Sequence, residues 1–465
     1  MLDLALKRER SDNMEDTIAA ISTALGVGAI SIVRVSGNEA IQIVNKIFQG
    51  KDLTKVNTHT IHYGKIMEKG KEIDEVLVSV MRAPYTYTSE DIVEINCHGG
   101  IATTNKILEL VLENGCRMAR PGEFTERRFL NGKIDLIQAQ GIKDLIDATS
   151  DEKRTLAMNQ LSGKVSSMIE HLRQEILEDI LANIEVNIDY PEYEDIKKLT
   201  NEDILPNLKK IKKEMEHILK ESRNGIMIQQ GIKTSIVGRP NVGKSSLLNA
   251  LLEENKAIVT DIEGTTRDIV EGEILVCGVP FHIIDTAGIR KSDHLVEQIG
   301  IQKSLELIDQ SELVLFVLNN NEPLTEDDIK IWNRLKDKNK IVIINKTDLP
   351  TKIKLDKITK EECVWISAGN QQGIDLVKEK MKEIFSLEKI QTEDPTYLTN
   401  ANSISSLKNA ITSIDQAITG IYQEMPIDMV EIDIKNAWDE LGLIIGKTYQ
   451  DELINQLFSQ FCLGK

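Results

Sequence analysis

The residues Gly238–Ser245 (GRPNVGKS) match the GxxxxGKS pattern of a phosphate-binding loop and directly follow a short apolar run. Glycine allows the backbone N–H groups of such a loop to point inward, toward phosphate oxygens. Lys244 would bring a cation to the outer phosphates and the Ser245 hydroxyl would bind Mg²⁺, while the next helix directs its positive N-terminus at the phosphates. The pattern therefore predicts a nucleoside-triphosphate site. Its expected ligand contacts are Asn241, Val242, Gly243, Lys244, Ser245 and Ser246.

A second pair of segments predicts that the base is guanine. Asn345–Asp348 (NKTD) follows the apolar run IVII, and Ser367-Ala368 follows VWI. The Asp348 carboxylate can accept hydrogen bonds from N1–H and from the N2 amino group of guanine. Adenine lacks this donor pair and would leave the carboxylate unpaired. A backbone N–H at Ser367-Ala368 would face the base O6. The predicted base contacts are Asn345, Lys346, Asp348, Ser367 and Ala368.

Two further segments lie between the phosphate loop and the base-reading motifs. In Gly264–Asp268 (GTTRD) a threonine can close over Mg²⁺ and the terminal phosphate. In Asp285–Gly288 (DTAG) the carboxylate can hold Mg²⁺ through water and the last N–H can sense the γ-phosphate, so that loop order depends on GTP. Five motifs in this order, at strand ends, predict a GTPase domain. The expected contacts in these segments are Thr266, Asp285, Thr286, Ala287 and Gly288.

The group that orients the attacking water is not evident from these motifs. Many small GTPases place a glutamine after the last glycine of DxxG, but this chain has Ile289, which cannot orient water. Phosphoryl transfer also needs positive charge beside the β–γ bridge, often from an arginine finger. The side chain of Asn241 offers instead a carbonyl oxygen that could hold a monovalent cation there. From the residues alone, both alternatives stay open.

Short apolar strands alternating with helices must position these motifs. That rhythm is typical of a parallel sheet wrapped by helices. The expected strands are 234–237, 281–284, 313–318, 341–344 and 364–366.

The sequence on both sides of this α/β domain predicts a multidomain chain of α+β and α/β parts. Strand-like runs at 29–35 and 75–81 with a helix near 106–112 indicate an N-terminal α+β domain. Amphipathic stripes precede and follow the α/β domain, so the simplest arrangement inserts it into one helical domain. The stripes run over 165–184, 208–218 and 404–421. The predicted boundaries are 1–132, 133–230, 231–386 and 387–465.

Composition limits the classes of partner and location. The 465 residues carry a net charge of −18, which argues against autonomous, tight RNA binding. If RNA is a substrate, we expect a partner to make much of the contact. The chain has no apolar run of membrane-spanning length and no signal-peptide pattern near Met1, so we expect it in the cytosol. Its five scattered cysteines form no CxxC pair, so neither a disulfide framework nor structural zinc is expected.

Distinctive motifs are spread along the chain: DTIAAIST, IVRVSG, YTSEDIVEINCHGG, ARPGEFTERRFLNGKIDL, GRPNVGKSSLLNAL, TDIEGTTRD and FCLGK. With these motifs the whole chain from about Met14 to Lys465 resembles the MnmE (TrmE) family of tRNA-modification GTPases, and residues 1–13 are expected to lie outside the match. The resemblance implies an N-terminal folate-binding domain that forms a homodimer, a discontinuous helical domain and an inserted G domain. It also implies that, with the FAD-containing flavoprotein MnmG, the chain modifies the wobble uridine of certain tRNAs at carbon 5.

The resemblance also implies roles for individual residues. K⁺ would stimulate hydrolysis as G domains dimerise, and Glu297 would orient the attacking water through a second water, acting with Lys244 and Asn241. A 5-formyl- or methylene-tetrahydrofolate would use basic side chains for its glutamate tail and a carboxylate for its pterin ring. The implied K⁺ ligands are Asn241, Thr260, Ile262 and Thr265; the implied folate contacts are Arg34, Glu94, Lys133 and Lys465.

Other hypotheses fit parts of the sequence. A ribosome-assembly GTPase shares the phosphate loop and TTRD segment, but such proteins usually carry a basic RNA-binding module, which is not evident here. A scaffold that only senses nucleotide would not need the full set of switch residues. Cys462 could be a nucleophile or redox group, but we assign it no catalytic role, and the tail CLGK fits a prenylation signal poorly.

Overall fold

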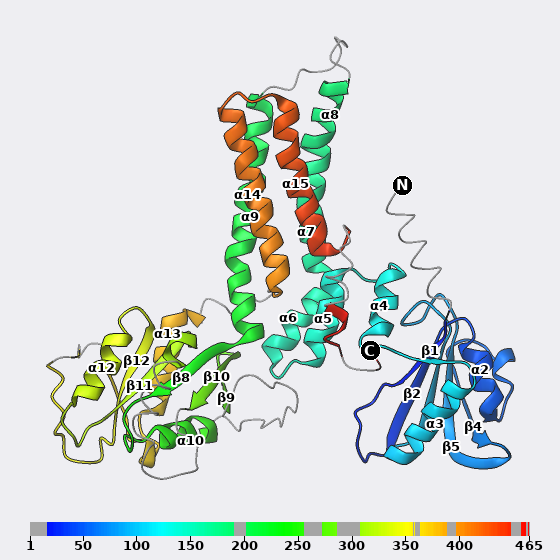
Figure 1. Cartoon of the computed structure of the whole chain (residues 1–465), viewed down its shortest axis with the longest axis horizontal. Coiled ribbons are helices and arrows are strands. Elements are labelled where there is room, and N and C mark those ends of the chain that lie inside the picture. Colours follow the sequence, from blue (N-terminus) through cyan, green and yellow to red (C-terminus); the bar gives the residue numbers. More distant parts are fainter. Residues whose placement is uncertain are drawn as a thin grey trace. The chain divides into compact units, whose positions relative to one another are not determined.

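The computed structural model describes residues 16–189, 201–254, 272–285, 307–356, 358, 363–387, 397–447, 457–461 and 464. The chain forms two compact units (Figure 1). One comprises Met1–Ile146, Gln160–Lys212 and Ser406–Lys465, and the other comprises Asp147–Asn159 and Lys213–Ser405. Both units combine segments that are far apart in sequence. Among the described residues, no helix is long and apolar enough to cross a membrane.

Seven strands of the first unit form one sheet in the order β3-β4-β5-β6-β2-β1-β7. Neighbouring strands are antiparallel except β1 and β7, which run parallel. The strands predicted over 29–35 and 75–81 are confirmed as β2 and β5. The strands are β1 Ile18–Ile21, β2 Ile30–Ser36, β3 Phe48–Gln49, β4 Thr60–Glu68, β5 Lys71–Met81, β6 Ile92–His98 and β7 Arg117–Met118.

Helices α2 (Ala40–Ile47) and α3 (Ile101–Glu113) pack against one face of this sheet (Figure 1). The sheet buries alternate residues there, as the period of two in a strand requires: from Val93 on, β6 buries Val93, Ile95 and Cys97 and leaves Glu94, Asn96 and His98 at least partly exposed. The helix predicted near 106–112 is confirmed as α3. The alternation places Arg34 of β2 and Glu94 of β6 on the opposite face.

The helices on either side of the inserted domain form a bundle, which confirms the predicted discontinuous helical domain (Figure 1). Cross-links join its members: Lys210 of α9 to Glu175 of α7, Lys212 of α9 to Asp415 of α14, and Arg173 of α7 to the Trp438 carbonyl of α15. The helices of this region and its approach are α4 Glu123–Leu130, α5 Leu136–Ile146, α6 Asp151–Leu161, α7 Lys164–Glu175, a π-helical segment Ile176–Leu181, α8 Ala182–Asp189, α9 Asn201–Gln230, α14 Ala401–Tyr422 and α15 Ile427–Ile445.

The second unit contains a six-stranded sheet in the order β13-β12-β11-β8-β10-β9. All neighbours are parallel except β9 and β10, and the five predicted strands are confirmed. The strands are β8 Ile232–Val237, β9 Gly272–Val276, β10 Val279–Asp285, β11 Leu313–Asn319, β12 Asn339–Asn345 and β13 Cys363–Trp365, and the helices are α10 Lys244–Glu254, α12 Glu326–Arg334 and α13 Ile374–Phe385.

Strand β11 shows why the strands of this sheet have continuous apolar sequences. All seven of its residues are buried. Leu313, Leu315 and Val317 join the core beneath α10 and α13, and the alternate residues join the core beneath α12. Helices on both faces leave no solvent-exposed side for polar residues.

The antiparallel strand β9 was not predicted. It pairs with β10 through the two-residue turn Cys277-Gly278, whose φ angles are 50° and 75°. Two consecutive positive φ values are typical of a type I′ hairpin turn, which Asn-Gly or Asp-Gly usually forms. Cysteine at the first position hides this signal in the sequence.

Candidate functional site

The phosphate loop joins the end of β8 to the start of α10. Its backbone takes positive φ at Gly238, Asn241 and Gly243, at 153°, 60° and 99°. A Cβ on Gly238 would lie 2.4 Å from the Val317 carbonyl oxygen, so only glycine lets β8 end this close to β11. The Lys244 Nζ donates to the carbonyls of Gly238 and Arg239 at 2.9 and 2.8 Å, which keeps the ammonium within the loop.

The amide of Asn345 joins three of the predicted motifs. Its Nδ2 donates to the Val242 carbonyl of the phosphate loop at 2.9 Å, and its Oδ1 accepts the Ala368 N–H at 3.0 Å. Asn345 is 2% exposed, so both polar atoms of its amide are satisfied inside the protein. The phosphate loop, NKTD and the Ser367-Ala368 segment are therefore fixed to one another.

Two further contacts complete this arrangement. The Lys346 Nζ donates to the Asn241 carbonyl at 2.7 Å, a second link between NKTD and the phosphate loop. The buried Ser367 hydroxyl donates to Asp348 Oδ1 at 2.6 Å and so orients the carboxylate, whose residue is exposed. An oriented, accessible carboxylate is what recognition of the guanine N1–H and N2 amino group requires.

The residues present fit a purine nucleotide with phosphates at the start of α10. A Cβ on Gly243 would lie 2.2 Å from Asn345 Nδ2, so this tight approach requires glycine. Ser245 and Ser246 are exposed in the first turn of α10, where helix N–H groups favour anions. The loops follow the carboxyl ends of parallel strands, the usual ligand-binding edge of such a sheet. Ser245 would contribute to Mg²⁺ binding there.

Several predicted contacts lie outside the described residues. Asp285 is the last residue of β10. The predicted residues outside the described ranges are Thr260, Ile262, Thr265, Thr266, Thr286, Ala287, Gly288, Glu297, Cys462 and Lys465.

One anchor of the phosphate loop was missed by sequence reasoning. The Arg239 Nε lies 2.9 Å from the carboxylate of Asp328, which is fully buried and caps α12 by accepting from the Thr325 N–H. Arg239 also lies 3.3 Å from Glu322 through Nη2. The side chain thus ties the loop to α12, while its own carbonyl accepts from Lys244. The partner lies 89 residues away, so no local pattern could identify it.

In the first unit, the structure brings together two of the residues assigned to folate. Arg34 and Glu94 are directly opposite in β2 and β6, and the Arg34 Nε donates to Glu94 Oε1 at 2.8 Å. Arg34 Nη1 also donates to the carbonyl of Gly464 at 3.2 Å, as does the Ser22 hydroxyl at 3.1 Å. The residue before Lys465 is therefore held beside this pair.

Aromatic rings lie beside Arg34 and beside two further cationic side chains, those of Arg128 and Lys133. The guanidinium carbon of Arg34 lies 5.5 Å from the centre of the Tyr87 ring, and that of Arg128 lies 4.8 Å from the same ring. Lys133 Nζ lies 6.0 Å from the centre of the Tyr85 ring. Such geometry gives cation–π attraction and a flat apolar surface beside positive charge. Sequence reasoning did not single out either tyrosine or Arg128.

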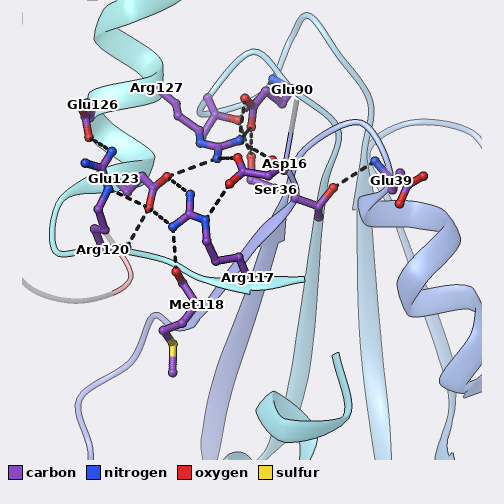
Figure 2. A network of polar contacts seen from close by, with 12 residues as sticks. Asp16, Ser36, Glu39, Glu90, Arg117, Met118, Arg120, Glu123, Glu126 and Arg127 are labelled. Atoms are coloured by element: carbon purple, nitrogen blue, oxygen red, sulfur yellow. Dashed lines mark hydrogen bonds and ion pairs between the residues drawn. The ribbon is translucent and has the colours of Figure 1, made fainter. Parts of the chain in front are cut away.

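A network of charged side chains fixes α4 to the sheet (Figure 2). Arg127, which is 0% exposed, donates to Asp16 Oδ1 at 2.6 Å and to Glu90 and Glu123 at 3.1 and 3.2 Å. Arg117 bridges Asp16 and Glu123, each at 2.6 Å. The buried guanidinium of Arg127 is thus compensated by three carboxylates, two of which also contact Arg117, where an unpaired buried charge would be costly. Asp16 and Glu90 lie 111 and 37 residues from Arg127, so no local sequence pattern could identify the network.

The network lowers the pKa of two of its carboxyl groups. Burial raises the pKa of Asp16, but hydrogen bonds from Arg117 and Arg127 outweigh it, and the net pKa lies below the ordinary 3.8. The pKa of Glu123 is likewise lowered from 4.5, because the hydrogen bond from Arg117 and the N–H of Arg120 outweigh its burial. The carboxylates therefore stay ionised through the neutral range.

Two family models match the chain along most of its length. The model for the GTP-binding protein TrmE N-terminus matches residues 17–133, and the model for the MnmE helical domain matches residues 136–462.

Curated relatives cover the chain almost completely. It is 52% identical over 456 residues to a tRNA modification GTPase MnmE of Bacillus cytotoxicus, spanning 97% of this chain and 99% of the relative. It is 51% identical to the tRNA modification GTPase MnmE of Ligilactobacillus salivarius, spanning 97% of this chain and 98% of the relative.

Solved structures match only a part of the chain. The G domain of the T. maritima FeoB iron transporter is 26% identical with a TM-score of 0.25, covering 33% of this chain and 98% of that domain. Aquifex aeolicus Era bound to GDP and AlF4⁻ is 25% identical with a TM-score of 0.26, covering 39% of this chain and 66% of Era. The family assignment therefore rests on the sequence relatives.

The close approach of Gly243 to Asn345 predicts a specific loss of nucleotide binding. In Gly243→Ala the added methyl group would meet the Asn345 amide and force the phosphate loop away from NKTD. We expect GTP affinity, measured by titration calorimetry, to fall about tenfold or more. Gly369→Ala is the control, because no atom lies within 4 Å of that Cβ position. Equal affinities of the two variants would contradict the tight contact.

The charged network predicts that the N-terminal sheet depends on Arg127. Arg127→Met would remove a partner of Asp16, of Glu90 and of the buried Glu123 carboxylate, and should lower the free energy of opening of β2 and β6 by about 3–5 kcal/mol. Arg120→Met, at a side chain 60% exposed, should change it by less than about 1 kcal/mol. Amide hydrogen exchange is measured on the full chain and evaluated at the amides of β2 and β6, so it reports the opening of this sheet separately from the other segments.

The stability of β2 and β6 in the same hydrogen-exchange measurement should also depend on pH, and the lowered pKa values of Asp16 and Glu123 fix the direction of that dependence. Because the folded pKa values of Asp16 and Glu123 are depressed, their stabilisation is complete above the ordinary values of 3.8 and 4.5. This stabilisation should be lost as the pH falls from these ordinary pKa values toward the lower pKa values of the folded protein. The loss should be smaller in Arg127→Met. Identical acid sensitivity of wild type and variant would contradict the account.

Proposed function

This chain belongs to the MnmE family of tRNA modification GTPases, and on that premise we propose that it uses GTP hydrolysis to modify the wobble uridine of certain tRNAs at carbon 5. Its GTPase activity in tRNA modification, with GTP and Mg²⁺ as ligands, follows from family membership. The observation that carries the assignment to this chain's own residues is the Asn345 amide, which fixes the phosphate loop, NKTD and Ser367-Ala368 in one site.

The described residues of the site have distinct proposed roles. Lys244 lies within the phosphate loop and supplies positive charge to the β- and γ-phosphates. Ser245 helps to hold Mg²⁺ at the start of α10. Asp348, oriented by Ser367, accepts the guanine N1–H and N2 amino hydrogens. Asp285, Thr266 and the remaining DTAG residues are proposed to complete Mg²⁺ and γ-phosphate binding.

We assign stimulation by K⁺ to the Asn241 side chain. Asn241 is exposed at the turn of the phosphate loop with φ of 60°, while its carbonyl is engaged by Lys346. Its side-chain oxygen is thus available to place a cation beside the β–γ bridge, with Thr260, Ile262 and Thr265. Glu297 is proposed to orient the attacking water, a role that Ile289 cannot fill.

The N-terminal domain is proposed to bind a 5-formyl- or methylene-tetrahydrofolate. The pairing of Arg34 with Glu94, the anchored Gly464 carbonyl and the rings of Tyr85 and Tyr87 support this proposal. They offer an acid for pterin donors, cations for a glutamate tail and flat apolar surfaces for a conjugated ring. Lys133 and Lys465 would add positive charge.

The proposed assembly is a homodimer that works with the flavoprotein MnmG, whose FAD supplies redox chemistry. The net charge of −18 supports a shared tRNA substrate, because this chain alone is poorly suited to neutralise an RNA backbone. The proposed domains remain 1–132, 133–230, 231–386 and 387–465. The ribosome-assembly alternative loses its basis, since the tRNA-modifying relatives cover 97% of the chain.

The cation role of Asn241 gives a kinetic prediction. Exchange of Na⁺ for K⁺ at equal ionic strength should raise the steady-state rate of GTP hydrolysis substantially. Asn241→Ala should abolish the difference with little change in GTP affinity. Asn333→Ala, at an exposed asparagine of α12, should keep it. Equal rates of the wild type in both salts would refute the cation mechanism.

Folate binding gives a thermodynamic prediction. Titration of the purified chain with 5-formyltetrahydrofolate should show saturable binding that Lys133→Ala weakens about tenfold, the effect of one lost charge-assisted hydrogen bond. Lys71→Ala, at an exposed lysine of β5, is the control. Absence of binding by chain that still binds GTP would remove the folate assignment and leave the GTPase assignment intact.

A further inference from the structure

The hairpin of β9 and β10 lies in sequence between two nucleotide-sensing motifs. It begins at Gly272, four residues after GTTRD ends, and finishes at Asp285, the first residue of DTAG. A Cβ on Gly272 would lie 2.8 Å from Leu252 of α10, so the hairpin also packs closely on the helix that follows the phosphate loop. The hairpin is therefore next to GTTRD and DTAG in sequence and in contact with α10 in space.

A charged pair spans this hairpin. Glu273 and His282 are directly opposite in β9 and β10, and His282 Nδ1 lies 3.3 Å from Glu273 Oε2. The other ring nitrogen, Nε2, donates to the carbonyl of Gln230 at 2.9 Å. Both ring nitrogens of His282 thus face acceptors, one on β9 and one at the last residue of α9.

The contact with α9 is tight. A Cβ on Gly231, where φ is 74°, would lie 2.5 Å from His282 Nε2. Only glycine lets the chain turn from α9 into β8 while the Gln230 carbonyl stays against the histidine. The end of α9 and the hairpin are therefore held in one arrangement.

The other end of the pair contacts the approach to α6. The Thr149 hydroxyl lies 3.5 Å from Glu273 Oε1, and the Ser150 hydroxyl lies at the same distance from the Gly278 carbonyl of the hairpin turn. A Cβ on Gly278 would meet the Glu152 side chain within 2.1 Å. Leu156 of α6 is 1% exposed in the same core as β8, β10 and α10.

Helices α6 and α9 share one further property. Each has residues in both compact units, because the unit containing β9 and β10 takes α6 up to Asn159 and α9 from Lys213. Along both helices the chain passes from one compact unit into the other. The hairpin contacts both.

We propose that Glu273 and His282 are positioning residues that couple the identity of the bound nucleotide, GDP or GTP, to α6 and to the end of α9. A shift of β9 or β10 on exchange of GDP for GTP would alter the pair and, through it, the Thr149 and Gln230 contacts. The proposal therefore requires that this set of hydrogen bonds differs between the GDP and GTP states.

If Glu273 and His282 had only a structural role, a different result would be expected. The pair would stabilise the hairpin equally with either nucleotide, so its removal would change stability without changing the response to nucleotide. Coupling requires that the two states differ in their interactions with α6 and α9.

The experiment compares amide hydrogen exchange of the full chain with GDP and with a non-hydrolysable GTP analogue, each with Mg²⁺. In the wild type, exchange in α6 and in 220–230 should differ several-fold between the nucleotides. In Glu273→Gln with His282→Leu, that difference should disappear while the difference at the phosphate loop remains. Asp309→Asn, which breaks the exposed pair with Arg334 in the same unit, should behave as wild type.

Two outcomes would overturn the proposal. One is a wild type in which α6 and 220–230 exchange identically with both nucleotides. The other is a double variant that keeps the nucleotide-dependent difference. If the double variant does not fold, Thr149→Val provides the second test, since it removes only the hydroxyl contact to Glu273 and should reduce the difference in α6 while leaving that in 220–230.

Discussion

The buried amide of Asn345 is the contact on which the nucleotide site depends. One side chain satisfies a carbonyl of the phosphate loop and an N–H of the Ser367-Ala368 segment, so loops from three strand ends become a single surface. An unpaired amide at that depth would cost about 1–3 kcal/mol, which makes the arrangement strongly preferred over looser ones. Gly243 accepts the close approach, and Lys346 and Ser367 fix the atoms on either side. The chemistry of phosphate and base recognition then follows from where the parallel strands end.

In the N-terminal domain, a network of charged side chains fixes the position of α4 and of the residues that it carries. Arg127 is buried and contacts Asp16, which precedes β1, Glu90 in the loop before β6 and Glu123 of α4, and Arg117 contacts two of the same carboxylates. The network fixes α4, and α4 carries Thr125, whose hydroxyl lies 2.9 Å from the Tyr87 hydroxyl beside Arg34. The residues proposed to bind folate are therefore positioned by a buried ion network rather than by their own local sequence.

Sequence patterns predicted the contiguous parts of both sites. The phosphate loop, NKTD and the strands before them follow from local chemistry and apolar runs, because each motif is read within a few residues. Contacts across the fold were not predictable in that way. The tie from Arg239 to Asp328, the pairing of Arg34 with Glu94 and the burial of Arg127 each join segments tens of residues apart. Strand β9 was missed because its I′ turn carries cysteine where asparagine or aspartate is usual.

The central claim is that guanine recognition at Asp348 drives tRNA modification. The most direct test expresses wild type or Asp348→Asn in cells that lack the chain and measures carbon-5-modified uridine in their tRNA by mass spectrometry of nucleosides. Asparagine would oppose a donor to the guanine N1–H and lose two charge-assisted hydrogen bonds, weakening GTP binding about a hundredfold or more. We predict that wild type restores the modified nucleoside and that Asp348→Asn, at equal protein level, does not. Full restoration by Asp348→Asn would contradict the account.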